Sequence, residues 1–281
     1  VLKIITARKW IIDAIHLPYY HLDSALKNRE LILYIRGLKT VISAKMILRF
    51  VDLALVVAHT KEEGYAKIFV QKFYIRKERI MAVPGGVDLD LINKFRAIVK
   101  SEKEKEGVIF KIFYVGGISK NKGNDLVDCI RFVRDKIPNI KLILVGPIRY
   151  NFHEKLINKV KHFGLIKEVV IRGRLAHSDV LKAIESADIC VNCMNASTRD
   201  YQYAHPQKLF EYMAFGKPIV ATDSEGTRGI IKDGYSGLLY ENGNVRDLAE
   251  KILMIYNDKR LAERLSKNAQ QSVGDFDWNR I

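Results

Sequence analysis

Short apolar runs alternate with longer amphipathic segments along most of this chain. Apolar runs of about four to eight residues predict buried strands, and apolar positions that recur every three or four residues predict helices. Strands and helices that alternate in this way form a parallel sheet with helices on both faces. The sequence therefore predicts an α/β protein built from doubly wound parallel sheets.

The clearest series of alternating elements begins at residue 108. Strands are predicted at 108–117, 141–147, 169–175, 189–194, 217–223 and 237–241. Helices are predicted between and after them, at 124–137, 153–164, 177–187, 206–216 and 244–256. These elements make a complete doubly wound, Rossmann-like domain over 108–281.

The first part of the chain contains fewer elements. Strands are predicted at 1–6, 10–17, 53–59 and 80–86, which is typical of the second half of another such domain. We therefore expect a partial first domain over 1–96, with the charge-rich stretch 97–107 as the linker to the second. The chain begins within a predicted strand at Val1 and ends where the pattern predicts the start of a helix, so we expect it to be a piece of a longer protein.

Composition excludes several classes of protein. Of the 281 residues, 48% are hydrophobic and 28% charged, which is typical of a folded soluble domain. Three cysteines are too few for a disulfide framework and favour a reducing compartment, so we expect a cytoplasmic protein. No apolar run reaches the roughly 18–20 residues of a membrane span.

The positive charge indicates anionic partners. The 47 basic and 32 acidic side chains leave a formal net charge of +15. This surplus favours nucleic acid, phosphorylated substrates or an anionic membrane. It is spread over both parts of the chain, and no zinc-finger or RNA-recognition motif accompanies it, so we expect no nucleic-acid partner.

One basic segment stands apart. Residues 34–51 place apolar side chains at helical spacing among arginines and lysines. A basic amphipathic helix can lie on an anionic membrane, which would place the protein at the inner face of the membrane. A helix of the domain with a solvated basic face would have the same pattern.

A glycine-rich loop follows the first strand of the second domain. Gly116 and Gly117 end the strand, and Lys122 and Gly123 lie where the next helix begins. Glycines let a backbone approach a phosphate, a helix N-terminus presents free N–H groups, and a lysine adds a point charge. A plain tight turn with a surface lysine is the alternative.

Two charged residues lie near the start of the helix at 206–216. Lys208 and Glu211 are three positions apart and share one helix face. The lysine can meet a phosphate, and the carboxylate can accept hydrogen bonds from ribose hydroxyls. Glu211 lies in an apolar stretch, where a carboxylate needs a partner; a solvated outer face is the alternative.

A third loop follows the strand at 217–223. Gly226, Thr227 and Arg228 are expected to precede a short helix and to offer a further anion site.

These three segments, in this order, resemble the retaining nucleotide-sugar glycosyltransferases of family 4, which have the GT-B architecture of two Rossmann-like domains. The segment 208–226 followed by 232–243 is similar to the family's longest motif. The segments 83–92 and 114–123 are similar to its domain entry and its glycine loop, and 276–281 to its C-terminal motif.

The resemblance implies transfer of a sugar from a nucleoside-diphosphate sugar, with retained configuration and without a metal or other cofactor. It places Lys122 and Lys208 on the donor diphosphate, with Gly116, Gly117 and Gly123 in the glycine loop. It also places Glu211 on the ribose, and Gly226, Thr227 and Arg228 near the phosphates or the sugar. His16 would lie near the transferred sugar, although a packed histidine at a strand end is the alternative. The acceptor would be a glycan, a lipid-linked molecule or a small molecule.

Three positions depart from the family pattern. Gly117 replaces the arginine that meets the diphosphate, and Tyr203 and Gly229 replace two glutamates. Loss of the arginine removes a contact worth about 1.5–3 kcal/mol, for which Lys120, Lys208 or Arg228 are candidates to compensate. These departures leave open a catalytically silent sugar-nucleotide-binding or scaffold subunit. A nucleotide-sugar epimerase is a further alternative on the same architecture.

Overall fold

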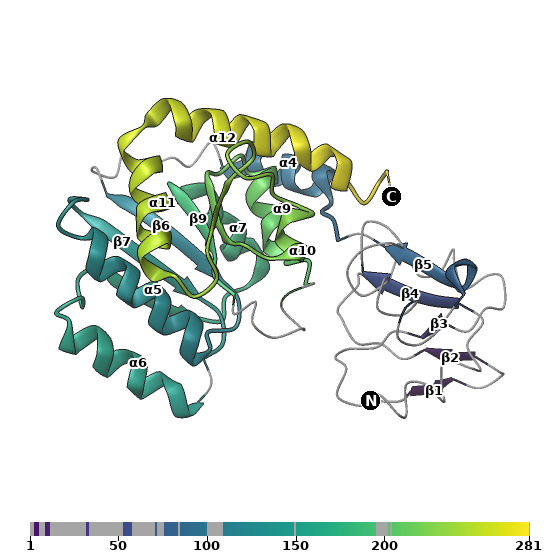
Figure 1. The fold of residues 1–281 in the computed structure, drawn as a ribbon, viewed down its shortest axis with the longest axis horizontal. Coiled ribbons are helices and arrows are strands. Elements are labelled where there is room, and N and C mark those ends of the chain that lie inside the picture. Colours follow the sequence, from purple (N-terminus) through teal and green to yellow (C-terminus); the bar gives the residue numbers. More distant parts are fainter. Residues whose placement is uncertain are drawn as a thin grey trace. The chain divides into compact units, whose positions relative to one another are not determined.

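The computed structural model describes residues 3–5, 9–11, 32–33, 53–57, 71, 76–83, 85–99, 109–148, 150–194, 202 and 204–280 (Figure 1). The chain divides into two compact units. The first comprises Val1–Gly85 and Tyr203–His205, and the second comprises Gly86–Gln202 and Pro206–Ile281.

Two small sheets make up the described part of the first unit. Strands β3 (Ile32–Leu33), β4 (Leu53–Val57) and β5 (Ile80–Val83) form a parallel sheet in that order, with the short 3-10 helix η3 (Lys77–Arg79) before β5. Strands β1 (Lys3–Ile5) and β2 (Lys9–Ile11) pair antiparallel. The prediction that all strands are parallel was therefore wrong for β1 and β2. The three residues that join β1 to β2 are too few for the crossover that parallel neighbours require.

The second unit contains a six-stranded, wholly parallel sheet in the order β11-β10-β9-β6-β7-β8. Its strands are β6 (Phe110–Val115), β7 (Ile140–Val145), β8 (Val169–Gly173), β9 (Ile189–Asn192), β10 (Ile219–Thr222) and β11 (Leu238–Tyr240). The chain builds outward from β6 to β8 and then returns to the other side of β6 with β9. This reversal is the topological switch point at which ligands bind in such sheets.

Helices cover both faces of this sheet. One buried apolar cluster joins the sheet to α5 (Lys120–Val133), α6 (Tyr150–His162) and α11 (Val245–Asn257). A second cluster joins its other face to α4 (Leu89–Val99), α7 (His177–Ser186) and α9 (Gln207–Ala214). The predicted α/β class and the doubly wound second domain are confirmed.

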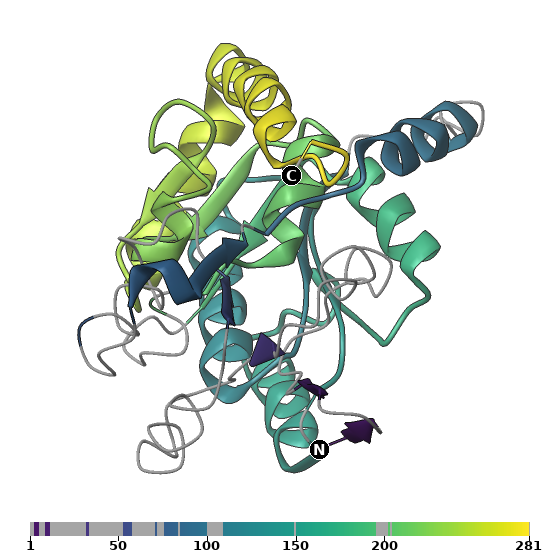
Figure 2. The same ribbon diagram turned by 90° about the vertical axis from the view of Figure 1, so that its right-hand side faces the viewer.

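Helix α12 (Lys259–Ser272) was absent from our predictions, because polar side chains dominate its sequence. It packs beside α9 and α11 and leads into the 3-10 helix η5 (Val273–Phe276) (Figures 1 and 2). Leu265 and Ala269 are fully buried, and Leu265 joins the first cluster while Ala269 joins the second. Figure 2 shows the helix lying along one end of the unit.

The segment after α12 returns to the start of the second unit. The Val87 N–H donates to the Phe276 carbonyl at 2.9 Å, and the Trp278 N–H donates to the Val87 carbonyl at 3.0 Å. The predicted domain entry and the C-terminal motif are therefore hydrogen-bonded to each other.

The domain boundaries stay a prediction. Helix α4, which we divided between the first domain and the linker, belongs to the second compact unit. Most of the linker predicted at 97–107 lies outside the described residues. In the ranges given above, no helix is both long enough and apolar enough to cross a membrane.

Candidate functional site

Three strand ends are brought together by backbone hydrogen bonds at the carboxyl edge of the large sheet. The Gly116 N–H donates to the Val145 carbonyl at 2.9 Å, and the Gly146 N–H donates to the Gly173 carbonyl at 2.7 Å. A Cβ atom on Gly146 would lie 2.1 Å from the Gly116 carbonyl oxygen, and Gly146 has a φ of +131°. Only glycine permits this approach, so the glycine loop after β6 has a defined backbone partner.

Tyr114, on β6, is hydrogen-bonded to the backbone of the glycine turn. Its side chain is fully buried, and its hydroxyl donates to the Gly117 carbonyl at 3.2 Å. The Nζ atom of Lys208 lies 4.3 Å from the centre of the Tyr114 ring. A Cβ atom on Gly116 would lie only 2.8 Å from the same Nζ. The structure therefore brings Lys208 against the backbone of the glycine turn.

A second lysine lies in the same region. Lys122, on the first turn of α5, is 9% exposed. Burial lowers the pKa of Lys208 to about 7, and the charge of Lys122 adds to this effect. A bound anion stabilises two protonated lysine side chains that repel one another in a partly desolvated site.

Helix α9 is held in register with β6 by a tyrosine. The Val115 N–H donates to the Tyr212 hydroxyl at 3.2 Å, and the Tyr212 ring packs edge-on to Phe113. Tyr212 lies one helical turn after Lys208. Because Tyr212 is fixed to the end of β6, Lys208 is directed to the loop that follows that strand.

Glu211 has the partner that its apolar surroundings require. Its Oε1 atom lies 2.9 Å from Nε2 of His177, the first residue of α7. The Glu211 side chain is 15% exposed and that of His177 is 59% exposed. The hydrogen bond to Glu211 raises the pKa of His177, against a smaller opposing effect of burial.

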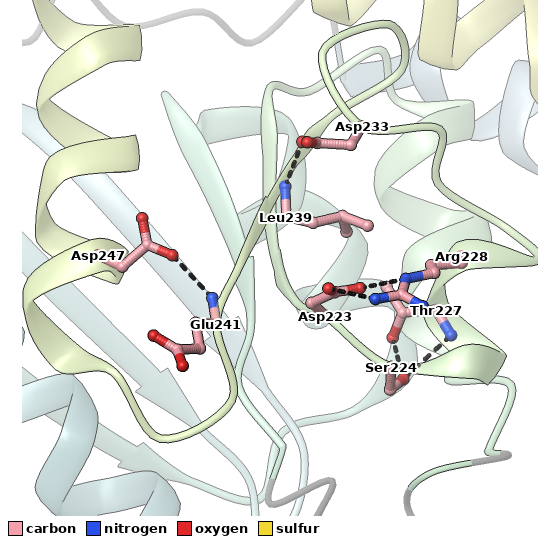
Figure 3. A network of polar contacts seen from close by, with 8 residues as sticks. All are labelled: Asp223, Ser224, Thr227, Arg228, Asp233, Leu239, Glu241 and Asp247. Carbon is pink, nitrogen blue, oxygen red and sulfur yellow. Dashed lines mark hydrogen bonds and ion pairs between the residues drawn. The ribbon is translucent and has the colours of Figure 1, made fainter.

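Figure 3 shows the loop after β10. Gly226, Thr227 and Arg228 lie within helix α10 (Glu225–Arg228) and not before it, which corrects our expectation. The Ser224 hydroxyl accepts from the Thr227 N–H at 3.1 Å and donates to the Thr227 hydroxyl at 2.9 Å. The Thr227 N–H is therefore already used by the helix cap.

Arg228 is paired with a carboxylate. It donates two hydrogen bonds of 2.6 Å to the two oxygens of Asp223 (Figure 3). A cavity of about 940 Å³ opens beside this pair, and its walls carry four carboxylates and two cations, those of Asp223, Asp233, Glu241, Asp247, Arg228 and Lys232. Because acidic groups outnumber basic ones in this lining, the pair of lysines beside Gly116 is better suited to an anion.

The remaining glycines differ in what surrounds them. A Cβ atom on Gly117 would have no heavy atom within 4 Å, so the place of the family's arginine is open space. A Cβ atom on Gly123 would lie 2.8 Å from the Phe152 ring, so packing of α5 against α6 requires this glycine.

Three helices that begin at the carboxyl edge of the sheet share one property. Within the described residues, α5, α7 and α9 have no side-chain hydrogen bond at their N-caps, whereas α10, α11 and α12 do. The N–H groups of the first turn of α5 are thus left without a capping side chain beside Lys122.

Several predicted features lie outside the described residues. They are His16, Tyr203 and the basic segment 34–51. In the described ranges, no group of three histidine, cysteine, aspartate or glutamate side chains is arranged to hold a metal ion.

Sequence analysis missed three residues that organise the site: Tyr114, Tyr212 and His177. A tyrosine directly before a glycine turn is a weak signal for Tyr114. No local signal identifies the other two, because their partners are 97 and 34 positions away.

The parallel sheet, its switch point and these residues define a Rossmann-type α/β protein with a site suited to a phosphorylated ligand. Residues 94–272 match the model of the family described as glycosyl transferases group 1. This match covers more than half of the chain, which therefore belongs to that family.

Relatives and solved structures agree with this assignment. An uncharacterised glycosyltransferase of Methanocaldococcus jannaschii is 32% identical over 152 residues, which are 53% of this chain and 43% of that protein. D-inositol 3-phosphate glycosyltransferase of Paenarthrobacter aurescens is 27% identical over 83% of this chain and 56% of its own length. The chain thus spans about half the length of these curated relatives.

The fold is similar to that of Anabaena HepE, solved in complex with UDP-glucose. The TM-score is 0.68 at 21% identity, over 91% of this chain and 71% of that one. Sucrose-phosphate synthase of Thermosynechococcus elongatus gives a TM-score of 0.67 at 19% identity, over 93% and 67% of the two chains. The predicted fold class and the resemblance to GT-B glycosyltransferases are confirmed.

Proposed function

We propose that this chain binds a nucleoside-diphosphate sugar and belongs to an enzyme that transfers the sugar to an acceptor with retained configuration and without a metal. One observation carries the proposal. The Lys208 amine lies against the backbone of the Gly116 turn, with Lys122 close enough to lower its pKa and Glu211 one turn further along the same helix.

The two lysines and the first turn of α5 are suited to the donor diphosphate. When the bond from the sugar to the diphosphate breaks, negative charge develops on the leaving group. Cations and N–H groups that are already in place stabilise that charge without further rearrangement. Gly116 and Gly117 let the backbone of the loop approach the phosphates.

Glu211 is suited to the ribose of the nucleotide. Its carboxylate accepts hydrogen bonds, and two ribose hydroxyls are matching donors. UDP is the first nucleotide to test, because the structurally similar HepE was solved with UDP-glucose. Because the Arg228 guanidinium is already paired with Asp223, Arg228 is a weaker candidate than Lys208 for binding the diphosphate.

The proposal extends to the acceptor side only through the family resemblance. A glycan, a lipid-linked molecule or a small molecule would receive the sugar, with His16 beside the transferred group. Residues 34–51 would contact an anionic membrane if the acceptor is lipid-linked.

Calorimetric titration with UDP, GDP and ADP tests the donor site. We expect micromolar binding of one nucleotide, weakened at least tenfold in Lys208→Ala and in Glu211→Ala. Lys155→Ala, an exposed lysine on α6, is the control and should bind as the wild type does. No binding to any nucleotide, or unchanged binding in both site variants, would contradict the proposal.

A second assay separates an enzyme from a silent binding subunit. The nucleotide sugar that corresponds to the bound nucleotide is incubated with the protein and with EDTA present. Slow release of free sugar, lost in Lys208→Ala, supports an active and metal-independent transferase. Tight binding with no release of sugar supports the silent subunit instead.

A further inference from the structure

A histidine and a glutamate join two helices at the carboxyl edge of the large sheet. His177 begins α7, directly after the loop from β8, and Glu211 lies in the second turn of α9. Their side chains meet at 2.9 Å, between Nε2 of His177 and Oε1 of Glu211. A carboxylate can only accept, so the imidazole N–H donates this bond.

The Glu211 side chain is much less exposed to solvent than that of His177. The Glu211 side chain is 15% exposed, whereas that of His177 is 59% exposed. Leu209, Phe210, Tyr212 and Met213, the neighbours of Glu211 on α9, are all buried. The carboxylate therefore has little water to orient it, and the imidazole supplies a fixed donor.

Only one carboxylate oxygen is used by this pair. Oε1 accepts from His177, and the described part of the chain supplies no hydrogen bond to Oε2. A bond to Oε1 fixes the rotation of the carboxylate and hence the direction of the lone pairs on Oε2. A ligand hydroxyl that approaches from the carboxyl edge of the sheet would meet an acceptor already in place.

We propose that His177 is a positioning residue, which orients the Glu211 carboxylate so that the site prefers a nucleotide with a ribose 2′-hydroxyl over its 2′-deoxy form. This inference rests on the proposed function, because it assumes that Glu211 faces the ribose. It assigns to α7 a role in nucleotide selection that neither the motifs of the sequence nor the family resemblance assigned.

The electrostatics of the pair agree with this role. The hydrogen bond to Glu211 raises the pKa of His177, so the pair attracts a proton and is strengthened when the imidazole is charged. Lys208 lies one turn before Glu211, and the Glu211 charge in turn favours the protonated form of that lysine. His177 thus gives the Glu211 carboxylate a hydrogen-bond donor from α7, in addition to the nearby positive charge of Lys208 on α9.

The test compares matched pairs of ligands: UDP with 2′-deoxy-UDP, GDP with 2′-deoxy-GDP, and ADP with 2′-deoxy-ADP. Dissociation constants are measured by calorimetry for the wild type, His177→Ala, His177→Gln and Glu211→Gln. His153→Ala, an exposed histidine on α6, is the matched control. The quantity of interest is the ratio of the 2′-deoxy constant to the ribonucleotide constant.

We expect a ratio of about tenfold in the wild type and in His153→Ala, the factor typical of one hydrogen bond to a charged group. His177→Ala should reduce this ratio to about two while leaving the affinity for the 2′-deoxy nucleotide unchanged. His177→Gln keeps a side-chain N–H donor and should recover part of the ratio. Glu211→Gln should remove most of the discrimination.

Two results would overturn the inference while leaving the donor site intact. One is an unchanged ratio in His177→Ala. The other is an equal loss of affinity for both members of a ligand pair, which indicates a general structural role. Absence of nucleotide binding by the wild type would instead overturn the proposed donor site, and this inference with it.

Discussion

The Lys208 amine lies 4.3 Å from the centre of the Tyr114 ring. The ring face attracts a cation, but burial and the charge of Lys122 oppose it and lower the Lys208 pKa to about 7. The same tyrosine holds the Gly117 carbonyl, so one side chain organises both the lysine and the glycine turn. The charge state of Lys208 therefore changes near neutral pH at the site proposed for a diphosphate.

This relationship predicts that donor affinity depends on pH. Below pH 7 Lys208 is already charged, and above pH 7 it must take up a proton when the diphosphate binds. Affinity for the nucleoside diphosphate that the site binds should therefore fall as pH rises from 7 to 9, by at most about tenfold per pH unit. Calorimetry in two buffers with different ionisation enthalpies measures both the affinity and the proton uptake.

Lys208→Arg is the control for that experiment, since a guanidinium stays charged over the whole range. Its affinity should vary little between pH 7 and 9. A pH-independent affinity in the wild type would show that Lys208 does not change its charge on binding.

Gly117→Arg should strengthen nucleotide binding. A Cβ atom at this position has no heavy atom within 4 Å, so a longer side chain is accommodated without a clash at its base. A guanidinium here would supply the charge-assisted contact that the family's arginine makes, and affinity for UDP should rise about 10–100-fold. Gly117→Gln adds similar length without charge and should give no such gain; a gain in both variants, or in neither, would contradict the prediction.

Gly146→Ala should destabilise the fold strongly. Its methyl group would lie 2.1 Å from the Gly116 carbonyl oxygen, and the residue also has a positive φ. We expect a loss of at least about 3 kcal/mol in the free energy of unfolding, measured with urea.

Gly243→Ala separates the clash from the backbone strain. Gly243 also has a positive φ, of +78°, but its Cβ position has no neighbour within 4 Å. Backbone strain alone should lower the free energy of unfolding by about 1–2 kcal/mol. Equal losses in the two variants would mean that the contact between the β6 and β7 loops is unimportant for stability.

Asp125→Asn should stabilise the protein at neutral and alkaline pH. Burial, with a contribution from Asp128, raises the pKa of Asp125 from 3.8 to about 6, while Lys159 opposes this. Because the folded-state pKa is the higher one, the wild type loses stability as pH rises from about 4 to 6 and remains less stable above. Asparagine carries no charge, so the variant should be more stable by about 1–2 kcal/mol at pH 8 and nearly equal to the wild type at pH 4, as measured by denaturant unfolding. The exposed Asp135→Asn should show no comparable difference between the two pH values.

Much of the fold could be predicted because its signals are local. The apolar runs that form β9 and β10 are fully buried, as a strand covered on both faces requires. Lys208 and Glu211 share a helix face because their spacing matches the helical period. The polar composition of α12 hides a helix whose few apolar positions are enough to pack it against α9 and α11.

The sequence by itself determined the alternation of strands and helices from β6 to α11, the glycine turn after β6 and the placing of Lys208 and Glu211 at the start of one helix. Each of these follows from residues within one or two turns of each other. Only the tertiary structure decided that Tyr212 anchors α9 to Val115, that His177 meets Glu211, and that Arg228 is held by Asp223 beside an acidic cavity. The first two contacts join residues far apart in the chain, and the third joins residues five positions apart across the turn from β10 into α10. The two long-range contacts arise from the packing of whole elements, which local periodicity does not record.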